Sequence, residues 1–209
     1  PNKQDVVKRQ FLSFEELNGI LSMAKKGALY QTGCPQTKAW IARDMLIMTL
    51  FMNTGMRRTA LSEINVDDIS FEDMSITVTD KRDKTQIYII TPQIKKAIED
   101  WLPLRAKILK DTKSDALFIN KYKTRLSDKA MYRLVEEYSQ IAIGKAISPH
   151  KLRASFIALY YEASGNDIQA TCEAVGHASI ATTSIYISKR NDSRKQAMEF
   201  MGKNLNTHL

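Results

Sequence analysis

Residues 149–187 read PHKLRASFIALYYEASGNDIQATCEAVGHASIATTSIYI, and this stretch decides how the chain is interpreted. Pro149 is suited to the first position of a helix that ends near Gly165. His150 and Arg153 are three residues apart on that helix, so their side chains share one face and can converge on one group. Taken alone, the pair has a simpler interpretation, in which His150 caps the helix or packs against it and Arg153 forms a surface ion pair.

A second pair follows and changes that interpretation. His177 lies 24 residues after Arg153, and Tyr186 lies nine residues after His177. A phenol can act as a nucleophile, an imidazole can manage its proton, and a guanidinium can neutralise the charge that grows on phosphate oxygens. The set therefore predicts metal-free attack on a phosphodiester.

Composition predicts an ordinary globular protein with a polyanionic partner. Of the 209 residues, 44% are hydrophobic and 26% are charged, which is enough for one domain with a sizeable core. The formal net charge of +8 favours nucleic acid, although a merely basic surface would give the same value. Cys34 and Cys172 match neither a metal site nor a disulfide framework, and no signal peptide or membrane-length apolar run is visible. We expect a protein of the reducing cytoplasm or nucleoid.

Periodicity and capping signals predict a mainly α fold with a small antiparallel β-sheet, of the α+β class. Ser13 begins a capping box, and the apolar face of the helix that follows is expected to hold Phe14, Leu17, Ile20, Leu21 and Ala24. Further helices are expected at about 37–53, 92–109, 127–143, 149–165, 167–175, 179–187 and 192–201, and strands at 75–79, 86–90 and 116–119, with a charged hairpin tip at 80–85.

Five stretches together resemble the catalytic domain of the tyrosine recombinases, the phage integrase family: TGMR (54–57), DDI (67–69), DKRDKT (80–85), HKLRASF (150–156) and VGHASIATTSIYI (175–187). The resemblance runs from about residue 9 to beyond residue 186, and it implies a prokaryotic or phage protein. It implies that family's fold, with a linker at 1–12, the catalytic domain at 13–190 and a C-terminal tail at 191–209 that could be exchanged between protomers.

The resemblance also implies roles for the site residues. Arg57 and Arg153 match the two arginines that clamp the scissile phosphate, with Arg58 as the neighbouring competitor for the first. His150 matches the residue that accepts the nucleophile's proton or hydrogen-bonds the phosphate. His177 matches the second histidine or tryptophan of the pocket.

Tyr186 matches the nucleophile that forms a 3′-phosphotyrosyl link, whereas Tyr88, Tyr160 and Tyr161 are interpreted as core or surface aromatics. The general acid of the family is a lysine on the hairpin. Lys84 is our choice, and Lys81 remains the alternative.

Two departures from the family pattern accompany these matches. The family usually has an acidic residue three positions after the first arginine, where this chain has Ala60. Glu63 lies nearby, but on a different face of a helix. The chain also begins at Pro1 with no room for the helical core-binding domain that commonly precedes the catalytic domain. We therefore expect either a fragment, which Pro1 favours, or one of the shorter recombinases.

The expected partner is double-stranded DNA at specific recombination sites, bound by a homotetramer, with accessory DNA-bending proteins as further candidates and no membrane. No cofactor or metal is expected. The function predicted is site-specific DNA recombination, as in the integrase or transposase of a mobile element; a type IB topoisomerase and a non-catalytic DNA-binding regulator are the alternatives. The candidate DNA-binding residues are Lys81, Arg82, Lys121, Lys123, Arg125 and Lys151.

Overall fold

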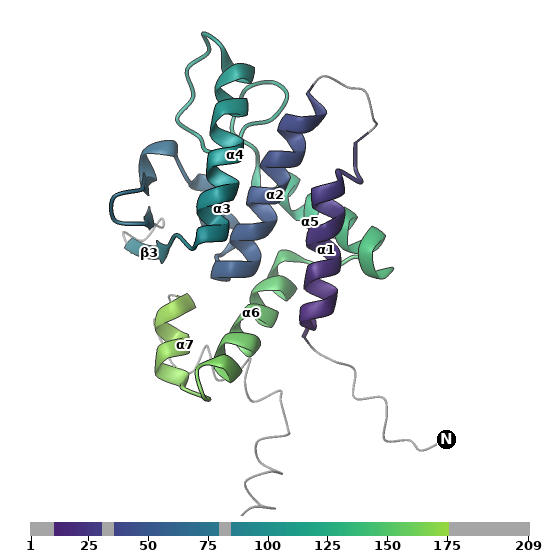
Figure 1. The fold of residues 1–209 in the computed structure, drawn as a ribbon, viewed down its shortest axis with the longest axis vertical. Coiled ribbons are helices and arrows are strands. Elements are labelled where there is room, and N and C mark those ends of the chain that lie inside the picture. The colour runs from purple at the N-terminus through teal and green to yellow at the C-terminus, as the bar shows by residue number, and fades with distance from the viewer. Residues whose placement is uncertain (1–10, 31–35, 80–84, 176–209) are drawn as a thin grey trace, which may run out of the picture. The chain divides into compact units, whose positions relative to one another are not determined.

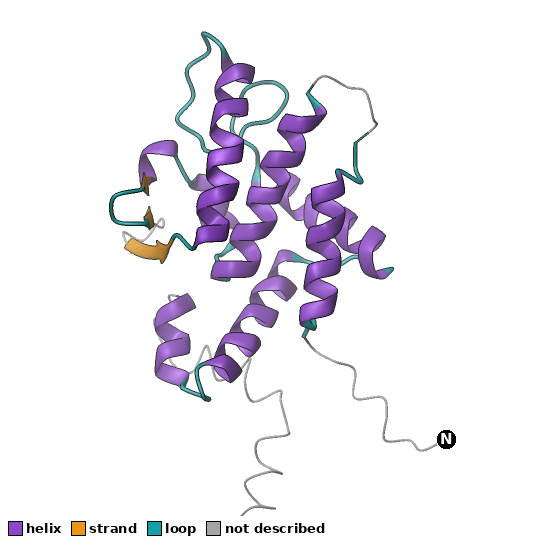
Figure 2. Cartoon of the chain, viewed as in Figure 1, coloured by secondary structure: helices purple, strands orange, loops and turns teal. Residues whose placement is uncertain are grey.

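Helices dominate the computed structural model, which describes residues 11–30, 36–79 and 85–175 (Figures 1 and 2). The elements are α1 (Phe14–Lys26), α2 (Thr37–Thr54), α3 (Arg58–Glu63), the 3-10 helix η1 (Val66–Asp68), β1 (Ile69–Ser70), β2 (Ser75–Thr79), β3 (Thr85–Ile89), α4 (Pro92–Leu109), α5 (Asp128–Ile143), α6 (Pro149–Ala163) and α7 (Ile168–Val175). The predicted fold class, mainly α with a small antiparallel sheet, is confirmed. The chain divides into two compact units, Pro1–Phe156 and Ile157–Leu209, with the boundary inside α6.

The central helix of the first unit is α2, which contacts both α1 and α4 (Figure 1). Six consecutive residues, 46–51, are buried, so the helix is enclosed on all sides in its second half. At its start α1 has the predicted capping box: Ser13 Oγ accepts from the Glu16 amide at 3.2 Å, and Glu16 Oε2 accepts from the Ser13 amide at 2.8 Å. Phe14 was wrongly placed on the apolar face, because its side chain is 66% exposed.

The three strands form one antiparallel sheet in the order β1-β2-β3. The register pairs Ile76 with Tyr88 and Val78 with Gln86. Alternation along a strand points these residues to the inner face, where Ile76, Val78 and Tyr88 are buried. Helix α3 contacts β2, so the sheet lies beside the helix that follows the TGMR motif.

Hydrogen-bonding side chains define the starts of α4 and α5. Thr91 Oγ1 accepts from the Ile94 amide at 3.4 Å and Pro92 occupies the first turn, while Ser127 Oγ accepts from the Ala130 amide at 3.2 Å. Both helices therefore begin where the sequence predicts.

The segment 116–119, predicted as a strand, does not form one. It makes two isolated bridges, Asn65 with Ala116 and Ile119 with Arg125. Two of its carbonyls are instead engaged by α4, since Trp101 Nε1 donates to Leu117 O and Arg105 Nε donates to Ala116 O, both at 2.9 Å. Side chains of α4 thus satisfy two carbonyls that a neighbouring strand would otherwise bond.

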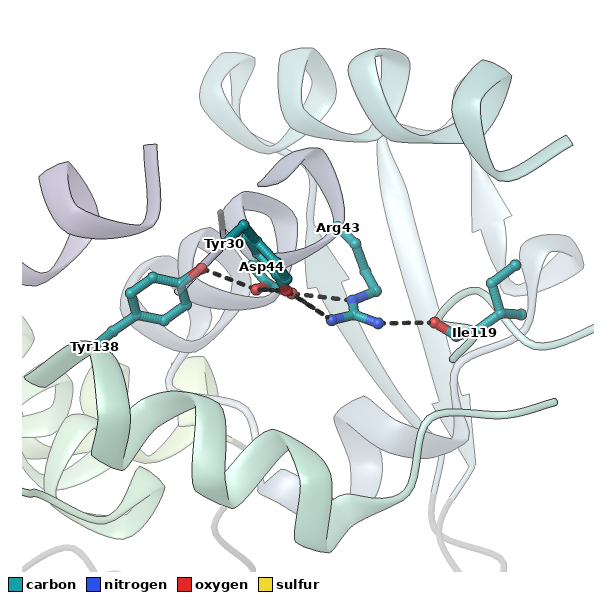
Figure 3. A network of polar contacts seen from close by, with 5 residues as sticks. All are labelled: Tyr30, Arg43, Asp44, Ile119 and Tyr138. Atoms are coloured by element: carbon teal, nitrogen blue, oxygen red, sulfur yellow. Dashed lines mark hydrogen bonds and ion pairs between the residues drawn. The ribbon is translucent and has the colours of Figure 1, made fainter. Parts of the chain in front are cut away.

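A buried polar network joins α2 to α5 and to the segment after α4 (Figure 3). Asp44 is fully buried and accepts hydrogen bonds from Arg43, from Tyr30 Oη at 2.6 Å and from Tyr138 Oη at 2.9 Å. Arg43 Nη1 continues to Ile119 O at 3.1 Å. Burial, and then the Asp44 charge, raise the pKa of both phenols, so both stay protonated near neutral pH. The network therefore carries a buried ion pair whose hydrogen-bonding capacity is largely used.

Two features complete the described chain. Between α6 and α7 the chain turns through Gly165 and Asn166, both with positive φ, and Asp167 Oδ1 accepts from the Ala170 amide at 3.0 Å at the start of α7. No helix in the described ranges is both long enough and apolar enough to cross a membrane. Residues 80–84 of the predicted hairpin tip and the last two predicted helices, 179–187 and 192–201, lie outside the described residues, whereas Thr85 begins β3.

Candidate active site

The TGMR motif is a tight turn between α2 and α3. Thr54 Oγ1 donates to Leu50 O at 2.6 Å and accepts from the Met56 amide at 3.1 Å, so it closes the end of α2 and begins the turn. Gly55 caps the helix with φ 58°, a left-handed conformation that favours glycine. Arg57 then takes an extended conformation as the residue before α3. Thr54 and Gly55 therefore each have a local reason for their residue type.

Gly55 has a second reason to be glycine, which is the approach of α6. A Cβ built at this position would lie 3.0 Å from Cγ and 3.1 Å from Cε1 of Phe156, and closer still to Cδ1. The ring of Phe156 therefore occupies the space of any larger residue. This contact brings two motifs together that are separated by nearly 100 residues.

Arg153 links the same two motifs by a hydrogen bond. Its Nη1 donates to the carbonyl oxygen of Gly55, and its side chain is buried, with the residue only 4% exposed. A buried guanidinium held by a backbone carbonyl loses little further freedom when it binds an anion. Arg153 is thus held in place by the turn that presents Arg57.

The structure distinguishes Arg57 from its competitor Arg58. Arg58 Nη2 pairs with Asp128 Oδ2 at 2.9 Å, and its guanidinium lies 5.4 Å from the ring centre of Tyr132. Arg57 is exposed and makes no hydrogen bond or ion pair with any residue that the structure describes. Of the two, Arg57 is the one whose guanidinium can turn to a ligand.

Arg57, His150 and Arg153 line one pocket of about 280 Å³. The full lining is Met56, Arg57, Arg58, Thr59, Tyr132, Ser148, Pro149, His150 and Arg153. The pocket lies at the N-terminus of α6, where helix amides and the helix dipole favour an anion. Ser148 caps this end, accepting from the Lys151 amide through its carbonyl at 2.9 Å and its Oγ at 3.3 Å. The arrangement can hold a phosphate between two guanidiniums and an imidazole.

The position three residues after Arg57 offers no acidic partner. Ala60 stands on α3, and Glu63 pairs with Arg125, with 3.9 Å between Arg125 Nε and Glu63 Oε2. The expectation that Glu63 serves another face therefore agrees with the structure. Among the described residues, neither position therefore gives Arg57 an acidic partner.

Tyr88 is a residue whose position near the site was not predicted. It is 4% exposed, and it was interpreted as a core or surface aromatic. Burial raises the pKa of its phenol, and the positive charges of Arg153 and Arg57 act on the same phenol in the opposite direction. The phenol therefore lies within the electrostatic reach of both arginines. The strand alternation that puts Tyr88 on the inner face was visible in the sequence, but its neighbours across the fold were not.

The candidate DNA-binding residues differ in how they are held. Lys121 is exposed, with Nζ 5.0 Å from the ring centre of Tyr122, whereas Lys123 Nζ donates to Leu109 O and Thr112 Oγ1, both at 3.3 Å. Arg125 donates to Ser62 O at 2.9 Å, to Ile64 O at 3.2 Å and to Asn65 Oδ1 at 2.6 Å. Lys151 is half-buried on α6. DNA contact remains a prediction for all four, and the roles of Lys123 and Arg125 within the fold are evident without DNA.

Several predicted site residues lie outside the described ranges: Lys81, Arg82, Lys84, His177 and Tyr186. Their roles stay predictions. Within the described ranges, no group of three His, Cys, Asp or Glu side chains is placed to hold a metal ion.

Comparisons with known proteins identify this architecture as the tyrosine recombinase catalytic-domain fold. The chain is similar to the crystal structure of XerA recombinase, with a TM-score of 0.72 and 26% identity over 90% of this chain and 64% of that one. It is also similar to XerH recombinase bound to a palindromic difH substrate in a post-cleavage complex, with a TM-score of 0.73 and 27% identity over 90% of this chain and 52% of that one.

A model of the phage integrase family matches residues 10–193, and the chain belongs to that family. Tyrosine recombinase XerC of Pseudomonas syringae pv. tomato is 35% identical over 144 residues, 69% of this chain and 47% of that protein. XerC of Shewanella amazonensis is 37% identical over 147 residues, 70% of this chain and 49% of that protein. The chain thus spans about half the length of these curated relatives.

Proposed function

We propose that this chain is the catalytic part of a site-specific DNA recombinase that cuts and rejoins strands through a 3′-phosphotyrosyl intermediate. The observation that carries the proposal is the pocket lined by Arg57, His150 and Arg153, with Arg153 buried and anchored on the turn that presents Arg57. Two planar guanidiniums suit the non-bridging oxygens of a phosphodiester, because each can donate two parallel hydrogen bonds. Membership of the phage integrase family supports the same chemistry.

In the proposed reaction the phenol oxygen of Tyr186 forms a bond to phosphorus while the bond to the 5′ oxygen breaks. The phenol proton passes to His150, and Lys84 supplies a proton to the leaving 5′ oxygen. Arg57 and Arg153 neutralise the charge of the pentacoordinate transition state, and His177 donates to the same phosphate. Attack by a 5′-hydroxyl on the phosphotyrosyl bond reverses these steps and rejoins a strand, so the bond energy is conserved.

The partner we propose is double-stranded DNA carrying a specific recombination site, bound by four copies of the protein. In this proposal the basic residues of the hairpin and of the 121–125 loop contact phosphates, which makes affinity fall steeply with salt as counterions are released. Integration of a mobile element is the setting we propose. A plasmid with two copies of the bound site tests whether the protein recombines DNA, since recombinants form only when two sites are paired.

A nicked suicide duplex tests the chemistry. Because cleavage beside a nick releases a short 5′-hydroxyl fragment, the covalent adduct accumulates and is seen on a denaturing gel. Duplexes with randomised arms allow the bound site to be recovered from the adduct and sequenced. We expect an adduct that forms in EDTA, disappears in Tyr186→Phe and persists in the matched control Tyr161→Phe.

Other outcomes would separate the alternatives. If no duplex gave an adduct although the protein still bound DNA, the proposal of an enzyme would be wrong, and a non-catalytic DNA-binding regulator would be indicated instead. Adducts on arbitrary supercoiled DNA, with relaxation and no recombinants, would indicate a type IB topoisomerase instead. An adduct that survives Tyr186→Phe would assign the nucleophile to another residue.

A further inference from the structure

The loop before α5 turns tightly at residues 120–124. The amide of Asn120 donates to Thr124 O at 2.9 Å, and its carbonyl accepts from the Lys123 amide at 3.0 Å. The side chain of Asn120 closes the turn a second time, since its Oδ1 accepts from the Tyr122 amide at 2.8 Å and from the Thr124 amide at 3.2 Å. Bonds to Asn120 therefore fix the backbone of the turn.

The base of this turn is anchored in the fold on both sides. Ile119 O accepts from Arg43 Nη1 at 3.1 Å on one side, and Arg125 donates to three acceptors at and just after the end of α3 on the other. Lys123 Nζ folds back to two acceptors at and just after the end of α4, both at 3.3 Å. A turn held in this way loses little further freedom when it binds a partner.

The turn presents to solvent the ring of Tyr122 and the ammonium group of Lys121. Tyr122 is 72% exposed, and Lys121 Nζ lies 5.0 Å from the centre of its ring. Neither Lys121 Nζ nor Tyr122 Oη makes a hydrogen bond or ion pair with a residue that the structure describes. A single exposed aromatic is ordinary on a protein surface, but this one is carried by a fixed turn and paired with a cation.

The surface around this tip is basic. The acceptors of Lys123 place the segment 110–115 beside the turn, and the segments 110–115 and 120–124 together hold four lysines and two aspartates. This excess of positive charge fits a polyanion. Phe71 offers the contrast, because it is also exposed, at 42%, but is followed by Glu72 and Asp73. Charge therefore favours nucleic acid at Tyr122 and disfavours it at Phe71.

The tip also lies within reach of DNA held at the candidate active site. Asp128, in the first turn of α5, pairs with Arg58, the neighbour of Arg57. Tyr122 is six residues before Asp128, so the chain that joins them spans at most about 20 Å. B-DNA rises by about 3.4 Å per base pair, so that length covers about six base pairs.

We propose that Lys121 and Tyr122 form a sequence-independent contact with the DNA beside the scissile phosphate. The ring of Tyr122 packs against a deoxyribose of the backbone, and Lys121 pairs with the phosphate next to it. Lys123 and Arg125 serve chiefly to hold the turn. The proposal rests on the proposed recombinase function and deepens it by naming the part of this loop that meets the DNA.

Binding of two arbitrary duplexes of unrelated sequence, each about 30 base pairs long, tests the proposal over a series of salt concentrations. Affinity is measured by fluorescence anisotropy. Every protein carries Tyr186→Phe, so that binding is measured without strand cleavage, and this variant is the parent. Tyr122→Ala, Tyr122→Phe and Lys121→Ala are compared with it, and Phe71→Ala is the matched control for removal of an exposed aromatic ring.

We expect Tyr122→Ala to bind both duplexes about five- to ten-fold more weakly, the fold-change of withdrawing about half of the ring from water. Because the ring carries no charge, the slope of log affinity against log salt should stay unchanged. Tyr122→Phe keeps the ring and should bind within about two-fold of the parent. Lys121→Ala should reduce the slope by about 0.9, the value for one phosphate contact. Phe71→Ala should change neither quantity.

An affinity of Tyr122→Ala equal to that of the parent would overturn the proposal. So would an equal loss in Tyr122→Phe, which would assign the contact to the hydroxyl, or a loss confined to one duplex, which would indicate base readout. If Tyr122→Ala changed only self-association, measured by sedimentation velocity without DNA, the tip would belong to a protein interface and the proposal would be wrong. Failure of the parent to bind either duplex would refute the proposed function itself, and is thereby distinguished from a failure of the tip.

Discussion

Replacing Gly55 by alanine should damage both stability and cleavage, and the structure allows the two causes to be separated. The φ of 58° places an alanine in the left-handed region, which costs about 1–2 kcal/mol. The new Cβ would overlap the Phe156 ring, and overpacking of this kind costs about 1–3 kcal/mol more. We expect a loss of about 2–5 kcal/mol in the free energy of unfolding, measured by urea denaturation.

Gly144→Ala is the matched control for this experiment. Gly144 also ends a helix with positive φ, 69°, but a Cβ there meets no atom of the described residues within 4 Å. It should cost only the backbone part, so Gly55→Ala should exceed it by about 1 kcal/mol or more. Equal losses at the two glycines would refute the reasoning about Phe156.

The functional effect of Gly55→Ala follows from the position of Arg153. Phe156 is one helical turn after Arg153, and the Gly55 carbonyl accepts from the Arg153 guanidinium. Displacing the ring should therefore move the arginine and slow cleavage of the suicide duplex about ten-fold or more. Phe156→Leu in the Gly55→Ala background should recover part of both losses. Full cleavage in the folded single variant would contradict this coupling.

Three further outcomes are expected. Arg57→Ala should lower the cleavage rate at least about 100-fold with most DNA affinity retained. Arg58→Ala should slow cleavage less than about ten-fold and cost about 1 kcal/mol of stability at most. Equal kinetic effects would contradict the distinction between the two arginines, and a larger effect of Arg58→Ala would mean that their roles were exchanged. Asp44→Ala should cost about 3–5 kcal/mol in urea denaturation, because it leaves the Arg43 charge buried and unpaired; a loss under 1 kcal/mol would contradict the network. The pKa values of Tyr30 and Tyr138 are raised in the folded state. Above about pH 10 the unfolded state therefore binds fewer protons than the folded state, so the free energy of unfolding should fall as the pH rises. The fall should be less steep in Tyr30→Phe.

Much of the secondary structure was predictable because its signals are local. The Ser13, Thr91 and Ser127 caps act on amides three residues away, so the starts of α1, α4 and α5 could be predicted from neighbouring residues. The exposure of Phe14 and the missing strand at 116–119 were not predictable in this way. Both depend on what the rest of the fold places beside those residues.

The candidate site shows the same division. Arg57 was chosen over Arg58 by resemblance and register, and the ion pair of Arg58 with Asp128 and its contact with Tyr132 give the choice a physical basis. Nothing in the sequence showed that Lys123 and Arg125 donate to backbone carbonyls, or that the Tyr88 phenol lies in the field of the arginines. Basic residues that look alike in a sequence are separated only by their partners.

The sequence by itself determined the helical fold with its small sheet and the residue types suited to phosphodiester chemistry. These depend on periodicity, capping and backbone sterics between near neighbours. Only the tertiary structure decided that Asp44 is satisfied by Tyr138, 94 residues away, and that Arg153 is anchored on Gly55, 98 residues away. The reason is that a buried charge is stabilised only by partners that folding brings to it, and no local pattern records which partners those will be.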